Sequence, residues 1–177
     1  MRFLTIALAL IISTWCGSIH AADDGLAQLH ARYHCEIVTR LAKLKAAKGP
    51  SDRFIIVGEV LRQAHFVQCL FDEAGARMLC EASSGFYTQK DGRPPRYVPT
   101  ADTIAAVARL GFSTDATAGN FQREMDAHTH EALSKIADLL LATLHEAYGI
   151  SVTTPIEIKA PLAPLSQKDR ARCLPMS

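Results

Sequence analysis

Residues 65–84 read HFVQCLFDEAGARMLCEASS, and this stretch predicts a β-hairpin in which two apolar segments flank the turn-forming residues DEAG. A two-residue loop at 74–75 places Cys69 directly opposite Cys80. Opposed Cα atoms in an antiparallel pair lie about 4.5–5.5 Å apart, which is within the reach of a disulfide. This register therefore predicts a Cys69–Cys80 bridge, whereas a loop one residue longer would change the register and remove it.

The segments before the hairpin extend it into a larger sheet. Residues 53–61 are rich in β-branched side chains, and short polar breaks separate them from the hairpin strands at 65–71 and 77–84. Strands this close together predict an antiparallel meander, because a parallel crossover needs about a dozen residues or more. Before the meander, apolar residues at spacings of three and four predict an amphipathic helix over residues 24–47.

The second half of the chain predicts two helices. Thr100 precedes a short helix as its expected N-cap, and Asn120 precedes a long helix over residues 121–148 that Gly149 ends. Residues 152–158 are interpreted as a last short strand, which its proline assigns to a sheet edge. The predicted fold class is α+β: an N-terminal helix, a three-stranded antiparallel meander, and then a short and a long helix packed on one sheet face.

Residues 1–22 have the features of a secretory signal peptide, with a basic start, an apolar stretch and small residues before Asp23. We expect residues 23–159 to form a single α+β domain. Residues 160–177 contain three prolines and are expected to be a loose tail unless Cys173 anchors them. The protein is therefore predicted to be exported, in a periplasmic or secreted location.

Composition argues against nucleic-acid binding and against insertion into a membrane. A formal net charge of +1 over 177 residues argues against a strongly basic nucleic-acid binder. Beyond the N-terminal segment, the sequence lacks an apolar run of about 18 residues, so stable membrane insertion is not expected. In an oxidising compartment the four cysteines after residue 22 favour disulfides, with three possible connectivities. If Cys69 pairs with Cys80, Cys35 and Cys173 are left to form a second bridge.

One cluster of residue types suggests metal chemistry. His30 and His34 are four residues apart, so both imidazoles lie on one helix face beside Cys35, as in zinc-binding helices. The other interpretation is a pair of solvent-facing histidines, because the sequence shows no third ligand. We identify no catalytic residue, no metal site with a full ligand set and no cofactor motif. The chain is predicted not to be an enzyme, with a cryptic hydrolase as the remaining alternative.

Two surfaces are predicted to bind a partner. One is the face of the sheet that the helices would leave open, since such faces take up peptides or form dimers. The other is the long loop after the hairpin, where aromatic residues accompany basic ones. The sheet residues are Phe54, Ile56, Phe66 and Leu70, and the loop residues are Phe86, Tyr87 and Tyr97 with Lys90, Arg93 and Arg96.

A succession of short motifs resembles a known family. Residues 110–112 read LGF, residues 120–121 read NF, and residues 136–150 read IADLLLATLHEAYGI. Over about residues 25–158 the chain resembles the TY-Chap domains, bacterial domains related in fold to type III secretion chaperones. The resemblance implies an α+β sandwich, often dimeric, that binds protein segments and carries no catalytic residues. A signal peptide followed by four further cysteines departs from a cytosolic chaperone and implies an envelope partner.

These observations predict an exported, non-enzymatic, chaperone-like module without a cofactor, which binds a protein segment or forms a homodimer through its sheet face. The alternative function is a metal-binding envelope protein that uses His30, His34 and Cys35.

Overall fold

The predicted hairpin forms the centre of the sheet. β2 (Phe66–Phe71) and β3 (Arg77–Ala82) are antiparallel, and Cys69 stands directly opposite Cys80 with Cα atoms 4.0 Å apart. A disulfide joins the two residues, which confirms the predicted register and bridge. The structure is a computed structural model that describes residues 20–49, 52–88, 97–117 and 119–174.

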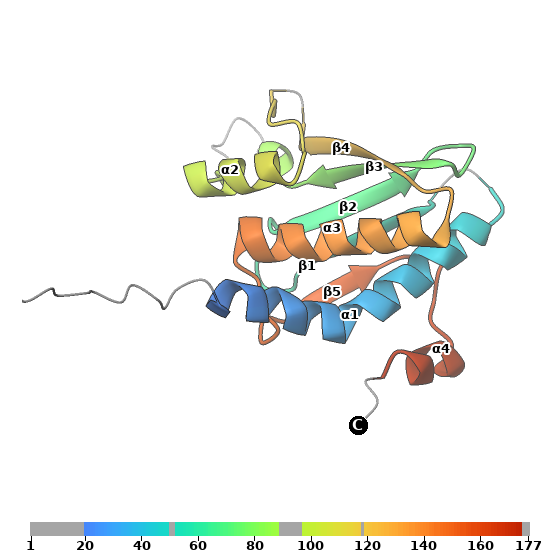
Figure 1. The fold of residues 1–177 in the computed structure, drawn as a ribbon. Helices are drawn as coiled ribbons and strands as arrows, with labels where there is room; N and C mark the ends of the chain where they lie inside the picture. The colour runs from blue at the N-terminus through green and yellow to red at the C-terminus, as the bar shows by residue number, and fades with distance from the viewer. Residues whose placement is uncertain (1–19, 50–51, 89–96, 118, 175–177) are drawn as a thin grey trace, which may run out of the picture.

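In the described part of the chain, five antiparallel strands form one sheet in the order β4-β3-β2-β1-β5 (Figure 1). β1 (Phe54–Glu59) pairs with β2 and completes the predicted meander. β5 (Ile156–Lys159) pairs with the other side of β1, so the predicted last strand does lie at an edge. β4 (Phe121–Asp126) pairs with β3 and forms the opposite edge.

β4 corrects the prediction of one long helix over residues 121–148. The helix α3 (His130–Tyr148) begins only after Thr129, whose side chain caps it. The sequence between Phe121 and Met125 fits both a helical spacing of four and the alternation of a strand. The free edge of β3 decides between them, because it supplies hydrogen-bond partners for a further strand.

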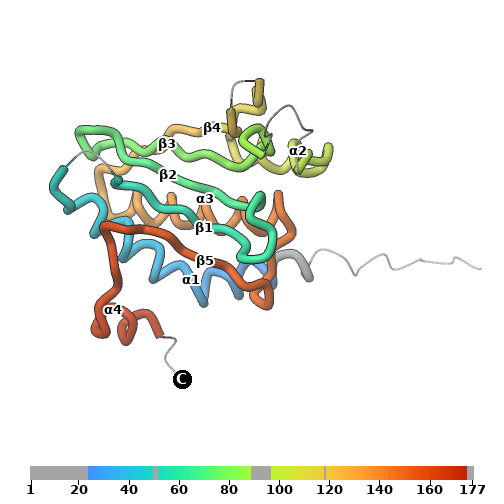
Figure 2. The backbone as a smooth tube through the Cα atoms, turned by 180° about the vertical axis from the view of Figure 1, so that it is seen from behind, coloured from blue at the N-terminus to red at the C-terminus, as the bar shows by residue number. Residues whose placement is uncertain are grey.

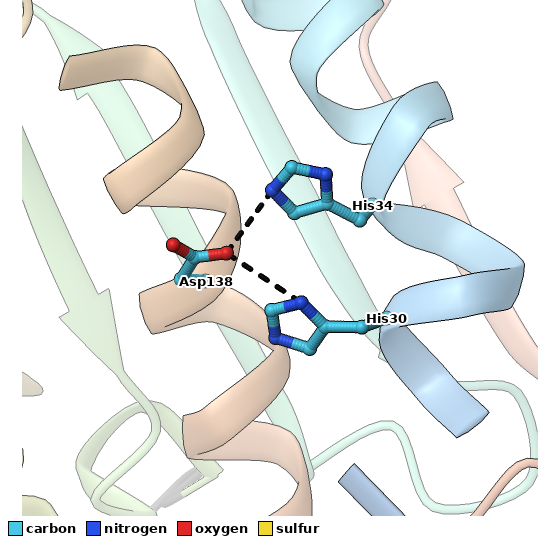
Figure 3. Close-up of side chains that lie close together, drawn as sticks. All are labelled: His30, His34 and Asp138. Atoms are coloured by element: carbon cyan, nitrogen blue, oxygen red, sulfur yellow. Dashed lines mark ion pairs between the residues drawn. The ribbon is translucent and has the colours of Figure 1, made fainter. Parts of the chain in front are cut away.

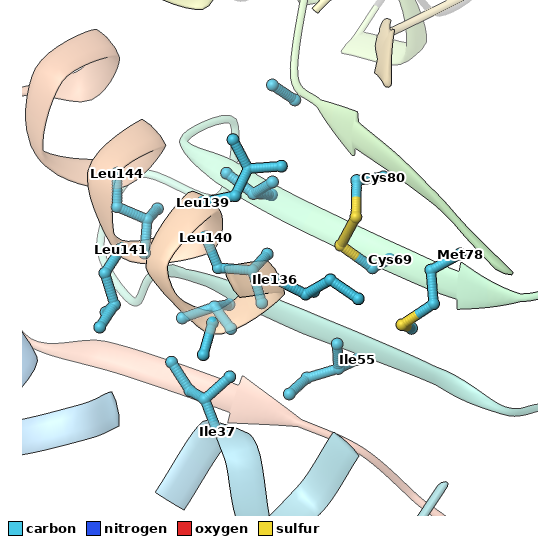
Figure 4. Packing of buried hydrophobic residues seen from close by; sticks show 14 of the residues in the cluster. Ile37, Ile55, Cys69, Met78, Cys80, Ile136, Leu139, Leu140, Leu141 and Leu144 are labelled. Atoms are coloured by element: carbon cyan, nitrogen blue, oxygen red, sulfur yellow. A yellow bond between two sulfur atoms is a disulfide. The ribbon is translucent and has the colours of Figure 1, made fainter. Parts of the chain in front are cut away.

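Helices cover one face of the sheet, as predicted (Figures 1 and 2). α1 (His20–Ala46) packs beside α3, and α2 (Ala101–Arg109) packs against α3 further along. Thr100 caps α2, and Gly149 ends α3 in the left-handed conformation, so both predicted boundaries are confirmed. The core lies between the helices and the sheet (Figure 4) and includes the fully buried side chains of Ile37, Leu41, Ile55, Val57, Val67, Met78, Ile136, Leu140 and Leu144.

The C-terminal segment is attached to α1. A disulfide joins Cys35 to Cys173, the second bridge predicted from the sequence. The segment also contains the short helix α4 (Gln167–Arg172), which begins with a capping box. Lys43 of α1 lies 2.6 Å from the Asp169 carboxylate. This contact, together with the hydrogen bonds that Asp169 accepts from Ser166, holds the pKa of Asp169 well below its usual range.

The predicted signal peptide falls mostly on residues 1–19, which lie outside the described residues; α1 begins at His20. None of the helices that the structure describes is both long enough and apolar enough to cross a membrane.

Candidate functional site

No helix in the described part of the chain covers the second face of the sheet, which is seen from the front in Figure 2. Alternate side chains of β1 and β2 point toward the helices and are buried, and those between them point away. The register places Phe54 beside Leu70 and Gly58 beside Phe66, with Ile56 between them on β1. The four sheet residues predicted to bind a partner therefore share the uncovered face.

Two adjoining hollows lie over β1 on this side of the described structure, and a third adjoins them beyond the end of β1. The central hollow, of about 310 Å³, lies over Gly58 between Ile56 and Phe66 and is bordered by Lys159 of β5. The second, of about 530 Å³, shares Ile56 and Lys159 with it and extends past Phe54 to the C-terminal segment. The third, of about 560 Å³, shares Phe66 with the central hollow and reaches the aromatic residues after the hairpin. We call this surface the β1 groove, and define it by Phe54, Ile56, Gly58, Phe66, Tyr87 and Tyr97.

Gly58 lines the central hollow at a point where β1 and β2 are packed very closely. A Cβ atom at this position would lie 2.8 Å from the Cβ of Phe66 and 2.9 Å from the carbonyl oxygen of His65. Both distances are shorter than a van der Waals contact, so β1 and β2 approach this closely only because residue 58 is glycine. The close packing at the floor of the groove therefore depends on one residue of β1.

Aromatic residues form one end of the groove. Tyr87 is 64% exposed at its rim, and Tyr97 is half-buried in its wall. Phe86 does not line the groove, since it lies with Tyr97 in a separate hollow of about 160 Å³. Residues 89–96, with the predicted contacts Lys90, Arg93 and Arg96, lie outside the described residues. The structure thus brings two of the three predicted aromatic residues to the groove.

The backbone around Gly85 holds the aromatic end in place. Gly85 has a φ of +81°, and a Cβ atom there would lie only 2.1 Å from the carbonyl oxygen of Tyr97. The Ser84 hydroxyl donates to the carbonyl of Gly119 at 2.7 Å, and its backbone N–H donates to Asn120 Oδ1 at 3.3 Å. Asn120 was expected to cap a helix; instead its side chain fixes this turn, a role that only the tertiary fold reveals.

A buried polar cluster underlies the same end of the groove. His65 lies 3.1 Å from the Glu59 carboxylate and stacks on Tyr148 with ring centroids 5.3 Å apart. The Tyr148 hydroxyl donates to the carbonyl of Ser83 at 2.9 Å. Burial raises the pKa of both Tyr148 and Tyr97 above the usual range, so both phenols remain neutral. The sequence pattern did not identify this cluster, because its members come from separate elements.

Leu70 shares the uncovered face but lies outside the groove. Its side chain is 46% exposed and lines a hollow of about 270 Å³ with Leu79, which is 36% exposed. Between this hollow and the aromatic end, Glu81 accepts hydrogen bonds from Gln68 and Gln122, so a polar ladder crosses β2, β3 and β4. The structure therefore separates Leu70 from the other three sheet residues of the prediction.

His30 and His34 meet a residue that sequence analysis did not identify, Asp138 of α3 (Figure 3). Asp138 Oδ1 lies 3.0 Å from His34 Nε2 and 3.6 Å from His30 Nδ1. Burial lowers the pKa of His30, and the nearby Asp138 carboxylate opposes this effect. Cys35 is joined to Cys173, so its sulfur is not a free thiolate. The predicted ligand set of His30, His34 and Cys35 is therefore wrong in its third member.

Comparison with models of protein families identifies the family of this chain. Comparison with curated proteins and with solved structures gives no match. The family model TY-Chap3, described as T3SS (YopN, CesT) and YbjN peptide-binding chaperone 3, matches residues 31–161. The matched range contains all of the sheet described above, together with α2, α3 and most of α1. The resemblance noted in the sequence is thereby confirmed, and the chain belongs to the TY-Chap3 family.

Proposed function

We propose that this chain is an exported, non-enzymatic binding module that holds an extended segment of a partner protein in the β1 groove. The observation that carries the proposal is the continuity of two hollows over β1 with a third beyond the end of that strand. β1 has 6 residues, so a groove along it matches an extended segment of about six residues at about 3.3 Å per residue. The family description as peptide-binding chaperones supports the same kind of occupant.

The lining of the groove indicates which segments it takes. Ile56 and Phe66 present half-buried apolar surface, and the neutral ring of Tyr97 extends it. In an extended chain, every second side chain points the same way. The preferred segment therefore alternates aliphatic or aromatic residues, which enter the hollows, with polar residues that remain in water.

Two pairs of oppositely charged residues lie beside the groove. Lys159 lies 3.1 Å from Glu157, and Arg62 lies 3.2 Å from Glu59. The opposite charges within each pair largely cancel, so we expect apolar contacts to dominate the interaction with the partner. The affinity for a peptide is therefore expected to change little with ionic strength.

The disulfides support the exported and non-enzymatic parts of the proposal. Such bridges persist in oxidising compartments, in agreement with the signal-like residues 1–22 and with a periplasmic or secreted location. All four cysteines of the described chain are bonded in these two bridges, so none is a thiolate nucleophile. Binding of a partner segment, rather than turnover of a substrate, is the function that these features support.

Fluorescence anisotropy with labelled peptides tests the proposal. The peptides alternate apolar residues with serine or threonine and carry no net charge. Ile56→Glu places a carboxylate in the floor of the groove, where Lys159 is its cross-strand neighbour and compensates its charge in the folded protein. We expect the wild type to bind such peptides and Ile56→Glu to bind them about ten-fold more weakly or worse.

Ile104→Glu is the matched control. Ile104 is an apolar residue of α2, 38% exposed, and lines none of the three hollows, so this variant should bind like the wild type. Equal binding by the wild type and Ile56→Glu would contradict the proposal, as would a wild type that binds none of the peptides. A wild-type dimer that Ile56→Glu dissociates in sedimentation would show instead that a second copy of the chain occupies the groove.

A further inference from the structure

Three metal-ligating side chains converge where α1 packs against α3 (Figure 3). His30 and His34 lie one turn apart on α1, and their stacked rings have centroids 5.3 Å apart at an interplanar angle of 14°. Each ring turns a nitrogen toward Asp138 Oδ1, and the three donor atoms lie within 4.8 Å of one another. The three donors therefore face a common point between the helices.

The two distances from Asp138 Oδ1 to the histidine nitrogens suit a single ion. Bonds of about 2.0–2.1 Å from a tetrahedral zinc ion to nitrogen and oxygen ligands place neighbouring ligands about 3.4 Å apart. The separations from Asp138 Oδ1, 3.0 Å to His34 Nε2 and 3.6 Å to His30 Nδ1, lie on either side of that value. Small side-chain adjustments would admit the ion without moving either helix.

Both helices are held firmly in the positions that bring the ligands together. His34 precedes Cys35, whose disulfide to Cys173 crosslinks α1 to the C-terminal segment. Next to Asp138 on α3, Ala137 is fully buried in the core, as is Ile37 on α1. Ligands carried by packed helices keep their geometry better than ligands on loops.

The surroundings of the site leave room for an exchangeable ion. The side chains of His30, His34 and Asp138 are 33%, 28% and 49% exposed, so solvent reaches them. Ser134 Oγ lies 3.2 Å from His34 Nε2 and adds a polar group beside the three donors. Among the described residues, Asp138 forms ion pairs with these two histidines alone, and no lysine or arginine competes for its carboxylate.

We propose that His30, His34 and Asp138 bind one divalent transition-metal ion, such as Zn²⁺, which crosslinks α1 to α3. Two imidazoles and one carboxylate suit zinc and its neighbours in the first transition row, whereas Ca²⁺ and Mg²⁺ favour all-oxygen sites. The site belongs to the helix layer, on the side of the sheet opposite the uncovered face. It stands independently of the peptide-binding proposal, because none of its ligands lines the β1 groove.

Calorimetric titration of the untagged, metal-stripped protein with Zn²⁺ tests this site. The wild type should bind one equivalent. Substitution of residues that only support metal ligands lowers metal affinity by about 10- to 100-fold, so loss of two ligands in His30→Gln/His34→Gln should lower it further. Asp138→Asn, which keeps the shape of the side chain, should also weaken binding. The control His128→Gln/His130→Gln removes two exposed histidines near the start of α3 and should bind Zn²⁺ like the wild type.

Thermal unfolding provides a readout that does not depend on the titration. Because an ion that binds only the folded state stabilises it, Zn²⁺ should raise the Tm of the wild type and of the control but not that of His30→Gln/His34→Gln. Circular dichroism of the metal-free variants verifies that they are folded. A wild type that does not bind Zn²⁺, a His30/His34 variant that binds it as tightly, or an equal loss in the control would overturn the proposal.

Discussion

The two faces of the sheet are built from the same strands but differ in what covers them. On the helix side, Ile55 and Val57 of β1 are completely buried beneath α1 and α3. On the other side, Phe54 and Ile56 of the same strand are only half-buried. An antiparallel sheet with one solvated face normally alternates apolar and polar residues, and β1 does not. The comparison teaches that the covered face stabilises the fold, whereas the uncovered face retains apolar residues for a partner.

A pair of identical substitutions gives the largest contrast between the faces. Leu140→Ala removes a fully buried side chain of α3 and should lower the free energy of unfolding by about 2–5 kcal/mol. Leu79→Ala on the uncovered face, where the side chain is 36% exposed, should cost about 1 kcal/mol or less. Urea unfolding measures both values, and similar costs for the two variants would show that the uncovered face also belongs to the folded core.

Removal of the Cys69–Cys80 disulfide tests whether the covered face contributes to stability without contributing to binding. It closes a loop with a sequence separation of 11 and lies fully buried under the helices. Cys69→Ala/Cys80→Ala should lower the free energy of unfolding by about 3 kcal/mol, because the unfolded chain regains entropy. Peptide affinity, measured well below the Tm, should remain that of the wild type. A variant that is folded yet loses peptide binding would contradict the division of roles between the faces.

A glycine with positive φ at the aromatic end of the groove, Gly85, provides a smaller effect, and Gly149 at the end of α3 is its comparison. Gly85→Ala combines backbone strain with a clash against the Tyr97 carbonyl and should cost about 1–3 kcal/mol while weakening peptide binding. Gly149→Ala has a φ of +66° but nothing within 4 Å of the new Cβ atom, so it imposes the strain alone. Equal peptide affinity of the two variants would argue that the position of Tyr97 does not matter for binding.

The sequence predicted those parts of the fold that local patterns determine. The predicted register, which pairs Cys69 with Cys80, is confirmed, although the turn spans Asp72–Ala76 and not 74–75 alone, and the left-handed Gly149 ends α3 as expected. The segment Phe121–Asp126 could not be assigned in this way, because its spacing suits a helix and a strand equally well. Its conformation follows from pairing with β3, which is a tertiary interaction.

The candidate sites show the same limit. Alternation along β1 and β2 correctly grouped Phe54, Ile56 and Phe66 on one face. The hollow over Gly58 and the link to Tyr97 arise from the packing of separate segments, so no single stretch of sequence contains them. Likewise, the spacing of His30 and His34 is visible along one helix, but Asp138 joins them only because α3 packs beside α1.

Peptide affinity of Ile56→Glu, measured beside Ile104→Glu, tests the central claim most directly. The β1 groove predicts a loss of about ten-fold or more for Ile56→Glu and wild-type affinity for Ile104→Glu, with both variants folded. Wild-type affinity in Ile56→Glu would contradict the claim that the uncovered face of the sheet binds the partner.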